Sequence, residues 1–176
     1  MRKVTLITGG ARSGKSRHAL VLAQANPGRR AFVATAEPLD EEMLERIRRH
    51  REDRDPSFLT IEEPVDLGKA LRSLPADVEV AVIDCLTVWL GNLMHCRRDE
   101  AGEPPELREL FALLAAPPCD LIIVTNEVGM GIVPGEAVAR RFRDLAGRIN
   151  QEVAKRADVV ILMVSGIPII VKQEAM

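Results

Sequence analysis

The sequence predicts an α/β domain in which a mostly parallel β-sheet carries helices on both of its faces. Short β-branched and aliphatic runs alternate along the chain with longer segments of helical periodicity, which is the element order of a doubly wound sheet. The predicted strands are apolar throughout, as expected of parallel strands that are buried on both faces. With 176 residues, no internal repeat and no shift in composition, the chain fits a single domain, residues 1–176.

The first predicted strand, which starts at Val4, leads directly into a glycine-rich motif. Residues 9–16 read Gly9-Gly10-Ala11-Arg12-Ser13-Gly14-Lys15-Ser16, the pattern G-x-x-x-x-G-K-S, and residues 17–24 read as a helix. Glycines let successive backbone N–H groups surround a phosphate, and the following helix presents its positive end to the same anion. Lys15 would contact the β- and γ-phosphates of a nucleoside triphosphate, and the Ser16 hydroxyl would join Mg²⁺. A simple glycine turn is the alternative, but the coincidence of strand, complete motif and helix favours a P-loop.

The remaining elements follow in alternation. Strands are predicted at residues 30–35, 58–61, 78–85, 121–125 and 159–164, with an edge strand at 169–172. Helices are predicted from the spacing of apolar residues at 39–53, 65–74, 87–96, 106–115 and 136–156. Asp40 is a candidate cap for the second helix, and the Asp55-Pro56 pair ends it. The polar segment 97–105 contains proline and glycine and reads as a loop.

Composition argues against several other classes of protein. The net charge of −2, the absence of tyrosine and the single tryptophan give no basic or aromatic surface for nucleic acid. Cys85, Cys96 and Cys119 have no CxxC spacing, so we expect neither a disulfide framework nor a zinc site. This cysteine usage fits a reducing, cytoplasmic location. The longest apolar tract, residues 159–171, is interrupted by Pro168 and is shorter than the roughly 20 residues of a membrane-spanning helix.

Ligands of parallel sheets bind at the carboxyl ends of the strands, so the residues that close each predicted strand are candidates for a site. Beyond the P-loop these are Ala34-Thr35-Ala36, Glu62, Asp84 and Thr125-Asn126-Glu127. Asp84 has the position at which P-loop proteins place the acid that holds Mg²⁺ through water, although an acid also occurs at a strand end by chance. Asn126 is followed by Glu127, so the Asn-Lys-x-Asp signature of guanine-binding switches is absent.

His50 is a second candidate for chemistry. It lies three residues after Ile47 and seven after Met43, which places it on the same face of the predicted helix. Nearby arginines are suited to bidentate phosphate binding: Arg46, Arg48, Arg49, Arg51 and Arg54. A neutral imidazole can attack phosphorus and form a covalent nucleotidyl intermediate. The alternative is a solvated basic helix end whose histidine only packs, and we expect His18 and His95 to be structural.

Three further segments carry a more specific pattern: Asp84-Cys85-Leu86-Thr87-Val88-Trp89-Leu90-Gly91-Asn92-Leu93, Thr125-Asn126-Glu127-Val128-Gly129-Met130-Gly131-Ile132-Val133-Pro134 and Arg141-Phe142-Arg143-Asp144-Leu145-Ala146-Gly147-Arg148-Ile149-Asn150-Gln151. With the P-loop and the arginine-rich helix, they resemble the bifunctional adenosylcobinamide kinase/adenosylcobinamide-phosphate guanylyltransferase family of cobalamin biosynthesis. The resemblance runs from the first strand to Gly166. It implies that ATP or GTP phosphorylates the aminopropanol hydroxyl of adenosylcobinamide. GTP would then donate GMP to a histidine, and adenosylcobinamide phosphate would take the GMP to give adenosylcobinamide-GDP.

The resemblance also implies roles for individual residues. His50 would be the guanylylated residue, and Lys15 would serve both reactions. Nucleotide contacts would fall on Gly9, Gly10, Ala11, Arg12, Ser13, Gly14, Lys15, Ser16, Ala34, Thr35, Ala36, Arg51, Glu52, Asp53, Arg54, Glu62 and Asp84. The family further implies a RecA-like P-loop NTPase sheet and a homotrimer. The chain departs from some members at Arg49, where they carry a second histidine, and at Asp84, where others have glutamate.

Two other interpretations stay open at this point. A P-loop kinase that acts on another small molecule would form no histidine adduct with GTP. A nucleotide switch or RecA-like assembly factor would bind nucleotide without turning over cobinamide and would need a partner. The missing guanine-switch signature and the lack of basic or aromatic surfaces argue against the second interpretation.

Overall fold

A computed structural model describes residues 2–52, 55–97 and 104–173. Within these residues seven strands form one sheet in the order β3-β2-β4-β5-β1-β6-β7. The strands are β1 (Val4–Gly9), β2 (Arg29–Ala34), β3 (Phe58–Glu62), β4 (Val78–Asp84), β5 (Asp120–Val124), β6 (Val159–Val164) and β7 (Ile167–Gln173). Neighbouring strands from β3 to β6 run parallel, and β7 pairs antiparallel with β6. The predicted α/β fold with a mostly parallel sheet is confirmed.

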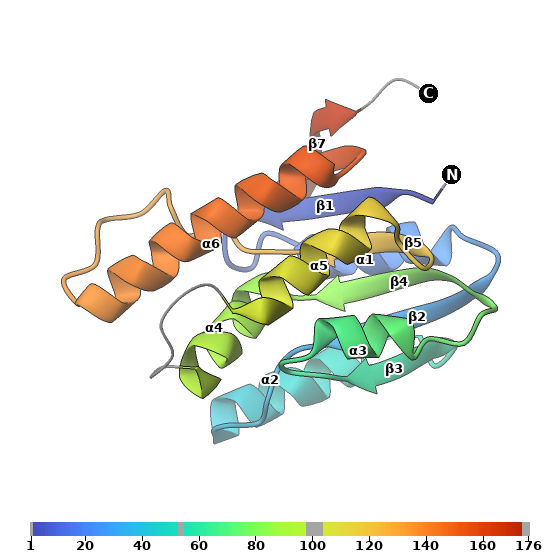
Figure 1. The fold of residues 1–176 in the computed structure, drawn as a ribbon, viewed down its shortest axis with the longest axis horizontal. Helices are drawn as coiled ribbons and strands as arrows, with labels where there is room; N and C mark the ends of the chain where they lie inside the picture. The colour runs from blue at the N-terminus through green and yellow to red at the C-terminus, as the bar shows by residue number, and fades with distance from the viewer. Residues whose placement is uncertain (1, 53–54, 98–103, 174–176) are drawn as a thin grey trace.

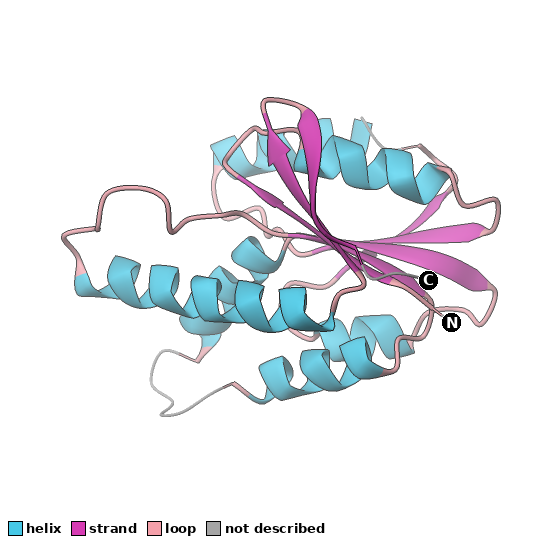
Figure 2. Ribbon diagram, turned by 90° about the horizontal axis from the view of Figure 1, so that it is seen from above, coloured by secondary structure: helices cyan, strands magenta, loops and turns pink. Residues whose placement is uncertain are grey.

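Helices cover both faces of this sheet (Figures 1 and 2). They are α1 (Lys15–Gln24), α2 (Glu41–Glu52), α3 (Leu67–Arg72), α4 (Leu86–Cys96), α5 (Pro105–Ala115) and α6 (Ala137–Arg156). α1 packs through Ala19 and Ala23 into an apolar cluster on one face, whereas α3 to α6 contribute to a larger cluster on the other. No described side chain of α2 belongs to either cluster, and this helix lies at the β3 end of the molecule (Figure 1). Among the described helices, none combines the length and the apolar character needed to span a membrane.

Each predicted element is found, with boundaries that differ by at most two residues. β7 begins at Ile167, two residues earlier than predicted, because Ser165 and Gly166 have φ values of 51° and 83° and close a two-residue hairpin turn. Asp40 caps α2 as predicted, since its Oδ1 accepts the N–H of Met43 at 2.7 Å. Of the predicted loop 97–105, residues 98–103 lie outside the described part of the chain.

β1 and β6 approach each other closely where the glycine-rich loop begins. Gly9 ends β1 opposite Met163 of β6 and has a φ of 148°, which residues with a side chain rarely adopt. A Cβ on Gly9 would lie 2.5 Å from the Met163 carbonyl oxygen and 2.9 Å from the Ser13 hydroxyl. A Cβ on Gly10 would have no heavy atom within 4 Å. Packing therefore requires glycine at residue 9 and leaves room for a side chain at residue 10.

We predict that Gly9→Ala destabilises the fold and that Gly10→Ala does not. The Gly9 substitution combines an unfavourable φ with a backbone overlap, so we expect a loss of at least about 2 kcal/mol in the free energy of unfolding. The Gly10 substitution is expected to change it by less than about 0.5 kcal/mol. Urea denaturation of both variants and the parent measures the difference, and equal stability of the two variants would contradict the close approach.

Candidate functional site

Residues 9–16 form a loop between β1 and α1 that is closed by its own hydrogen bonds. The N–H of Ser13 donates to the Gly10 carbonyl at 3.3 Å, and Gly14 caps α1 with a φ of 93°. Lys15 is buried, and its Nζ donates to the Gly10 carbonyl at 2.6 Å and to Ser13 Oγ at 3.3 Å. The strand–loop–helix context expected of a P-loop is therefore present, with an ammonium group held inside the loop at the positive end of a helix.

The topology brings the other predicted residues to the same edge of the sheet. In the register, Ala34 of β2 lies beside Glu62 of β3 and beside Asp84 of β4. Asp84 lies beside Val124, the last residue of β5, and Val124 lies beside Ile7 of β1. From β3 to β1 this row crosses four strand spacings, or about 19 Å. Asp84 thus ends a strand two positions from the P-loop strand, and Glu62 stands at the far end of the row.

Asp84 has an unusual environment. Its Oδ2 atom is buried and finds no hydrogen-bond partner among the described residues. Its backbone carbonyl accepts the N–H of Thr35 at 3.2 Å, which fixes its place in the sheet. A buried acceptor without a donor costs roughly 1–3 kcal/mol, more if it is charged. The carboxylate is therefore suited to a ligand that brings positive charge or a donor.

The side chain of Thr35, the residue directly after β2, and side chains of α4 tie together the ends of three strands. Thr35 Oγ1 accepts the N–H of Cys85 at 2.8 Å and donates to the carbonyl of the same residue at 2.9 Å. Asn92 of α4 donates through Nδ2 to the carbonyls of Thr35 and Pro64 at 2.8 and 3.0 Å. Trp89, fully buried one turn earlier, donates to the Val65 carbonyl at 2.6 Å. The Thr35 side chain is thus engaged within the protein itself.

A second set of hydrogen bonds holds the segment that follows β5. Thr87 Oγ1 accepts the N–H of Asn126 at 2.7 Å, and Asn150 Nδ2 donates to the Asn126 carbonyl at 3.2 Å. The Thr125 hydroxyl donates to Asn150 Oδ1 at 2.8 Å and lies 3.2 Å from the Thr87 hydroxyl. The Glu127 N–H donates to the Gly9 carbonyl at 3.0 Å. Two helices on one face and the P-loop strand therefore fix this segment.

The supporting roles of Asn92 and Asn150 were missed by the sequence analysis. Each is an amide on an otherwise apolar helix face: Asn92 between buried leucines, and Asn150 directly after the buried Ile149. A carboxamide at such a position needs internal partners, because an unsatisfied buried amide is costly. That mismatch is the signal from which a connection to neighbouring loops could have been predicted.

Two of the arginines predicted as candidates for phosphate binding, Arg48 and Arg49, pair with glutamates of α2 itself. Arg48 pairs with Glu45 and Glu52 at 2.8 and 2.6 Å, and Arg49 pairs with Glu45 at 2.8 Å. Hydrogen bonds from Arg48 and then Arg49 lower the pKa of Glu45 to about 2. Both glutamates belong to the same helix, at the i,i+3 and i,i+4 spacing that favours such pairs.

His50 lies on the half-buried side of α2 with Met43 and Ile47, as the spacing predicted. Arg51, the next residue, forms an ion pair with Glu62 at the carboxyl end of β3. The carboxyl end of β3 is about 19 Å from that of β1. Among the described residues His50 makes no hydrogen bond or ion pair. The structure therefore brings Arg51 and Glu62 together but does not bring His50 to the P-loop.

The other predicted residues are placed as follows. Glu52 accepts a hydrogen bond from Arg48, and Asp53 and Arg54 lie outside the described residues. His18 is partly buried in α1, and burial lowers its pKa. His95 is exposed in the last turn of α4.

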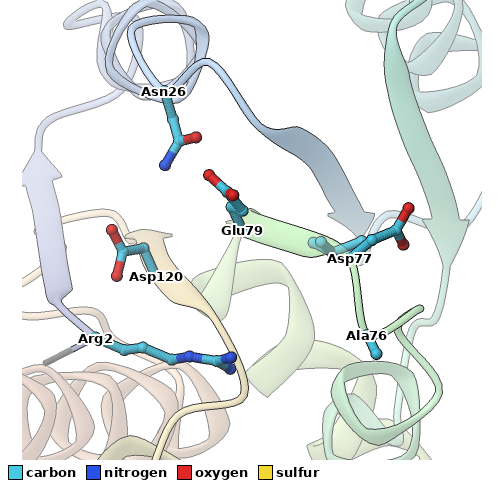
Figure 3. Close-up of a pocket in the computed structure, with 7 residues that line it drawn as sticks. Arg2, Asn26, Ala76, Asp77, Glu79 and Asp120 are labelled. Carbon is cyan, nitrogen blue, oxygen red and sulfur yellow. The ribbon is translucent and has the colours of Figure 1, made fainter.

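A pocket of about 430 Å³ lies at the opposite edge of the sheet, where β4 and β5 begin (Figure 3). It is lined by Arg2, Asn26, Ala76, Asp77, Val78, Glu79 and Asp120. Asp120 accepts the N–H of Lys3 at 2.8 Å, and Asp77 pairs with Arg29 at 3.0 Å on the surface. Because ligands of parallel sheets bind at the carboxyl ends of the strands, this pocket is not the candidate site.

Comparison with known proteins agrees with the geometry. The bifunctional adenosylcobalamin biosynthesis protein CobU of Escherichia coli is 38% identical, over 95% of this chain and 98% of that protein. The corresponding CobP of Pseudomonas aeruginosa is 41% identical, over 96% of this chain and 97% of that protein. Among solved structures, the RadB recombinase has the same P-loop fold, with a TM-score of 0.53 at 16% identity, covering 91% of this chain and 73% of RadB. The family described as cobinamide kinase / cobinamide phosphate guanyltransferase matches residues 5–171. The chain therefore belongs to this family of bifunctional kinases and nucleotidyltransferases.

Proposed function

We propose that this protein catalyses both reactions of its family on one P-loop. In the first, ATP or GTP phosphorylates the aminopropanol hydroxyl of adenosylcobinamide. In the second, GMP passes from GTP to adenosylcobinamide phosphate, giving adenosylcobinamide-GDP and pyrophosphate. The observation that carries the proposal is the loop itself: the buried ammonium of Lys15 lies inside a glycine loop at a helix N-terminus.

In this proposal residues 9–16 bind the phosphates of the nucleotide. Their backbone N–H groups and Lys15 would stabilise the charge that develops on the leaving group, a diphosphate in the kinase step and pyrophosphate in the transfer. The residues that close β2, β3 and β4, from Ala34 to Ala36, Glu62 and Asp84, would contact the rest of the nucleotide along the edge of the sheet. Arg51, Glu52, Asp53 and Arg54 at the end of α2 would contribute from the same side.

The residues present fit a Mg²⁺ ion that accompanies the triphosphate. The orphaned Oδ2 of Asp84 is an oxygen ligand without a competing donor in the described protein, and Ser16 stands in the first turn of α1. The described residues contain no cluster of three or more metal-binding side chains, which fits Mg²⁺, because this ion is usually held by one or two protein oxygens, water and phosphate. When bound, it would supply positive charge that stabilises the phosphates.

We predict that Asp84→Asn weakens binding of Mg²⁺–GTP by about tenfold or more without lowering stability. The substitution removes the charge of a half-buried carboxylate whose Oδ2 has no hydrogen-bond partner among the described residues, so the free energy of unfolding should stay the same or rise. Calorimetric titration with GTP in the presence and absence of Mg²⁺ measures the first effect, and urea denaturation the second. Wild-type affinity for Mg²⁺–GTP in the variant would exclude Asp84 from the metal site.

We further propose that His50 carries the GMP in the transfer reaction. Its imidazole would attack the α-phosphorus of GTP; the bond between that phosphorus and the bridging oxygen breaks, and pyrophosphate leaves with the electron pair. Since the end of α2 lies beside β3, the helix has to move toward the P-loop when GTP binds. Weak attachment of α2 supports this movement: its described side chains lie outside both core clusters, and Leu44 is 56% exposed.

The position of His50 also favours a second candidate function. If α2 stays at β3, the protein would be a P-loop small-molecule kinase that forms no covalent histidine intermediate. Labelling with GTP carrying ³²P at the α-phosphate separates the two candidates, because only the transferase retains radioactivity on the protein.

We predict that His50→Ala abolishes this labelling and leaves phosphorylation of cobinamide in place. The reason is that the γ-phosphate passes directly to the acceptor hydroxyl, whereas GMP needs the imidazole. His95→Ala is the matched control, since His95 is an exposed histidine near the end of another helix, and it should label like the parent. Mass spectrometry should find a single GMP adduct at residue 50, and full labelling of the His50 variant would remove this residue from the mechanism.

Finally, we propose a homotrimer in the cytoplasm. The number of three subunits comes from the family resemblance. Association is supported by the exposed apolar side chains of β7, which are 47–65% exposed: Ile167, Ile169, Ile170 and Val171. The cysteines are free and Cys96 is exposed, which fits a reducing compartment.

We predict a particle of three 19.4-kDa chains in sedimentation equilibrium. Ile170→Asp should lower the mass, because a charge on β7 would be desolvated in the interface. Val21→Asp serves as the control, since Val21 is an apolar residue of similar exposure (54%) on α1. A parent protein that sediments as a monomer at micromolar concentration would contradict the proposal.

A further inference from the structure

The carboxylates near the candidate site differ in what they already bind. Glu62 is paired with Arg51, and Glu63 accepts the backbone N–H groups of Val65 and Asp66. Glu127 accepts one backbone N–H, that of Gly129, at 2.7 Å through Oε1. In the described part of the chain, no ion pair of Glu127 is found. Its second oxygen, Oε2, is thus an acceptor that no described cation neutralises.

Glu127 is also held against the P-loop. Its N–H donates to the carbonyl of Gly9, the first residue of the loop, at 3.0 Å. β5 is the immediate neighbour of β1, with Val124 opposite Ile7, so the residue stands about one strand spacing, roughly 5 Å, from the strand that carries the loop. Glu62 is about four times as far away along the same edge.

Side chains of two helices hold the backbone of Asn126, the residue before Glu127. Thr87 of α4 binds the N–H of Asn126, Asn150 of α6 binds its carbonyl, and both side chains also contact Thr125. Both backbone groups of Asn126 are therefore held by side chains from different helices. Such support orients the next side chain without a cost at the moment of reaction, as catalytic groups require.

The two proposed reactions differ in whether their nucleophile must lose a proton. The acceptor of the kinase step is an alkyl hydroxyl, which is protonated at neutral pH. The nucleophiles of the transfer are a neutral imidazole nitrogen, which has a free lone pair, and a phosphate monoester, whose second pKa of about 6 leaves it largely ionised. Only the kinase step therefore needs a proton acceptor.

From this geometry we propose that Glu127 is the general base of the kinase step, an inference that rests on the proposed function. Its carboxylate takes the proton of the aminopropanol hydroxyl as that oxygen bonds to the γ-phosphorus. The bond from the γ-phosphorus to the bridging oxygen breaks, and the nucleoside diphosphate leaves with the electron pair. The protonated Glu127 then returns its proton to water. Thr87 and Asn150 are positioning residues that act through Asn126.

The test is Glu127→Gln, which keeps the Oε1 acceptor for the Gly129 N–H and removes the basic oxygen. We expect kcat for cobinamide phosphorylation to fall by about 10²–10⁴-fold, the range of general-base catalysis. Labelling of the protein by α-³²P-GTP and transfer of GMP to preformed cobinamide phosphate should stay at the level of the parent. Urea denaturation should give the parent's stability.

Two control variants bracket this result. Lys15→Ala should lose both activities, because both use the P-loop. Glu136→Gln should lose neither, since Glu136 is an exposed glutamate without a capping hydrogen bond at the start of α6. A Glu127→Gln enzyme that phosphorylates cobinamide at the parent's rate, or that loses both activities equally, overturns the role of Glu127. A parent enzyme that never phosphorylates cobinamide would instead contradict the proposed function, so the two failures are distinct.

Discussion

The pairing of β1 with β5 is the constraint on which the candidate site depends. The N–H groups of Thr125 and Glu127 donate to the carbonyls of Ile7 and Gly9, each at 3.0 Å, and so continue the ladder past the end of β5. A shift of this register by one residue would turn every side chain of β5 to the other face of the sheet. The hydroxyl of Thr125 would then lose Asn150, and the segment after it would no longer be fixed beside the P-loop.

Two levels of rigidity meet at this edge of the sheet. The P-loop and the segment after β5 are held by the sheet, by α4 and by α6, whereas the described side chains of α2 belong to neither core cluster. The difference matches the chemistry proposed for each part. A kinase step needs a phosphate, a hydroxyl and a base in one fixed geometry. In the proposed transfer, His50 has to approach GTP and then bring the bound GMP to cobinamide phosphate. A firmly packed helix would prevent this movement.

Much of the fold could be predicted because local signals and global topology agree. The β-branched runs and the Asp40 cap each act within a few residues, and the structure follows them closely. The P-loop was predictable for the same reason, since its conformation is set by its own glycines. The sequence could also place Asp84 at a strand end, but the missing partner of its Oδ2 depends on the packing of several segments.

What escaped prediction depends on contacts between distant residues or on charge compensation. Asn92 and Asn150 act on loops that follow other strands, 24 to 57 residues away in the chain. The sequence shows five arginines close to His50, but it does not show which of them form ion pairs in the folded helix. In the folded helix, Glu45 and Glu52 lie one turn away from Arg48 and pair with Arg48 and Arg49. Only the side-chain geometry distinguishes a phosphate-binding patch from a network of surface ion pairs.

The energies involved make a movement of α2 feasible. The ion pair between Arg51 and Glu62 joins side chains that are 56% and 57% exposed, and pairs of this kind contribute about 0–1 kcal/mol. A nucleotide bound at micromolar affinity releases about 8 kcal/mol, but it can shift the helix only by the part of that energy that differs between the two positions. In the proposed mechanism Arg51 would offer such a difference, because a guanidinium that leaves a solvated carboxylate for a phosphate can form a stronger, bidentate contact. If Arg51 released Glu62 and bound a phosphate of GTP instead, this residue next to His50 would couple GTP binding to the movement of α2.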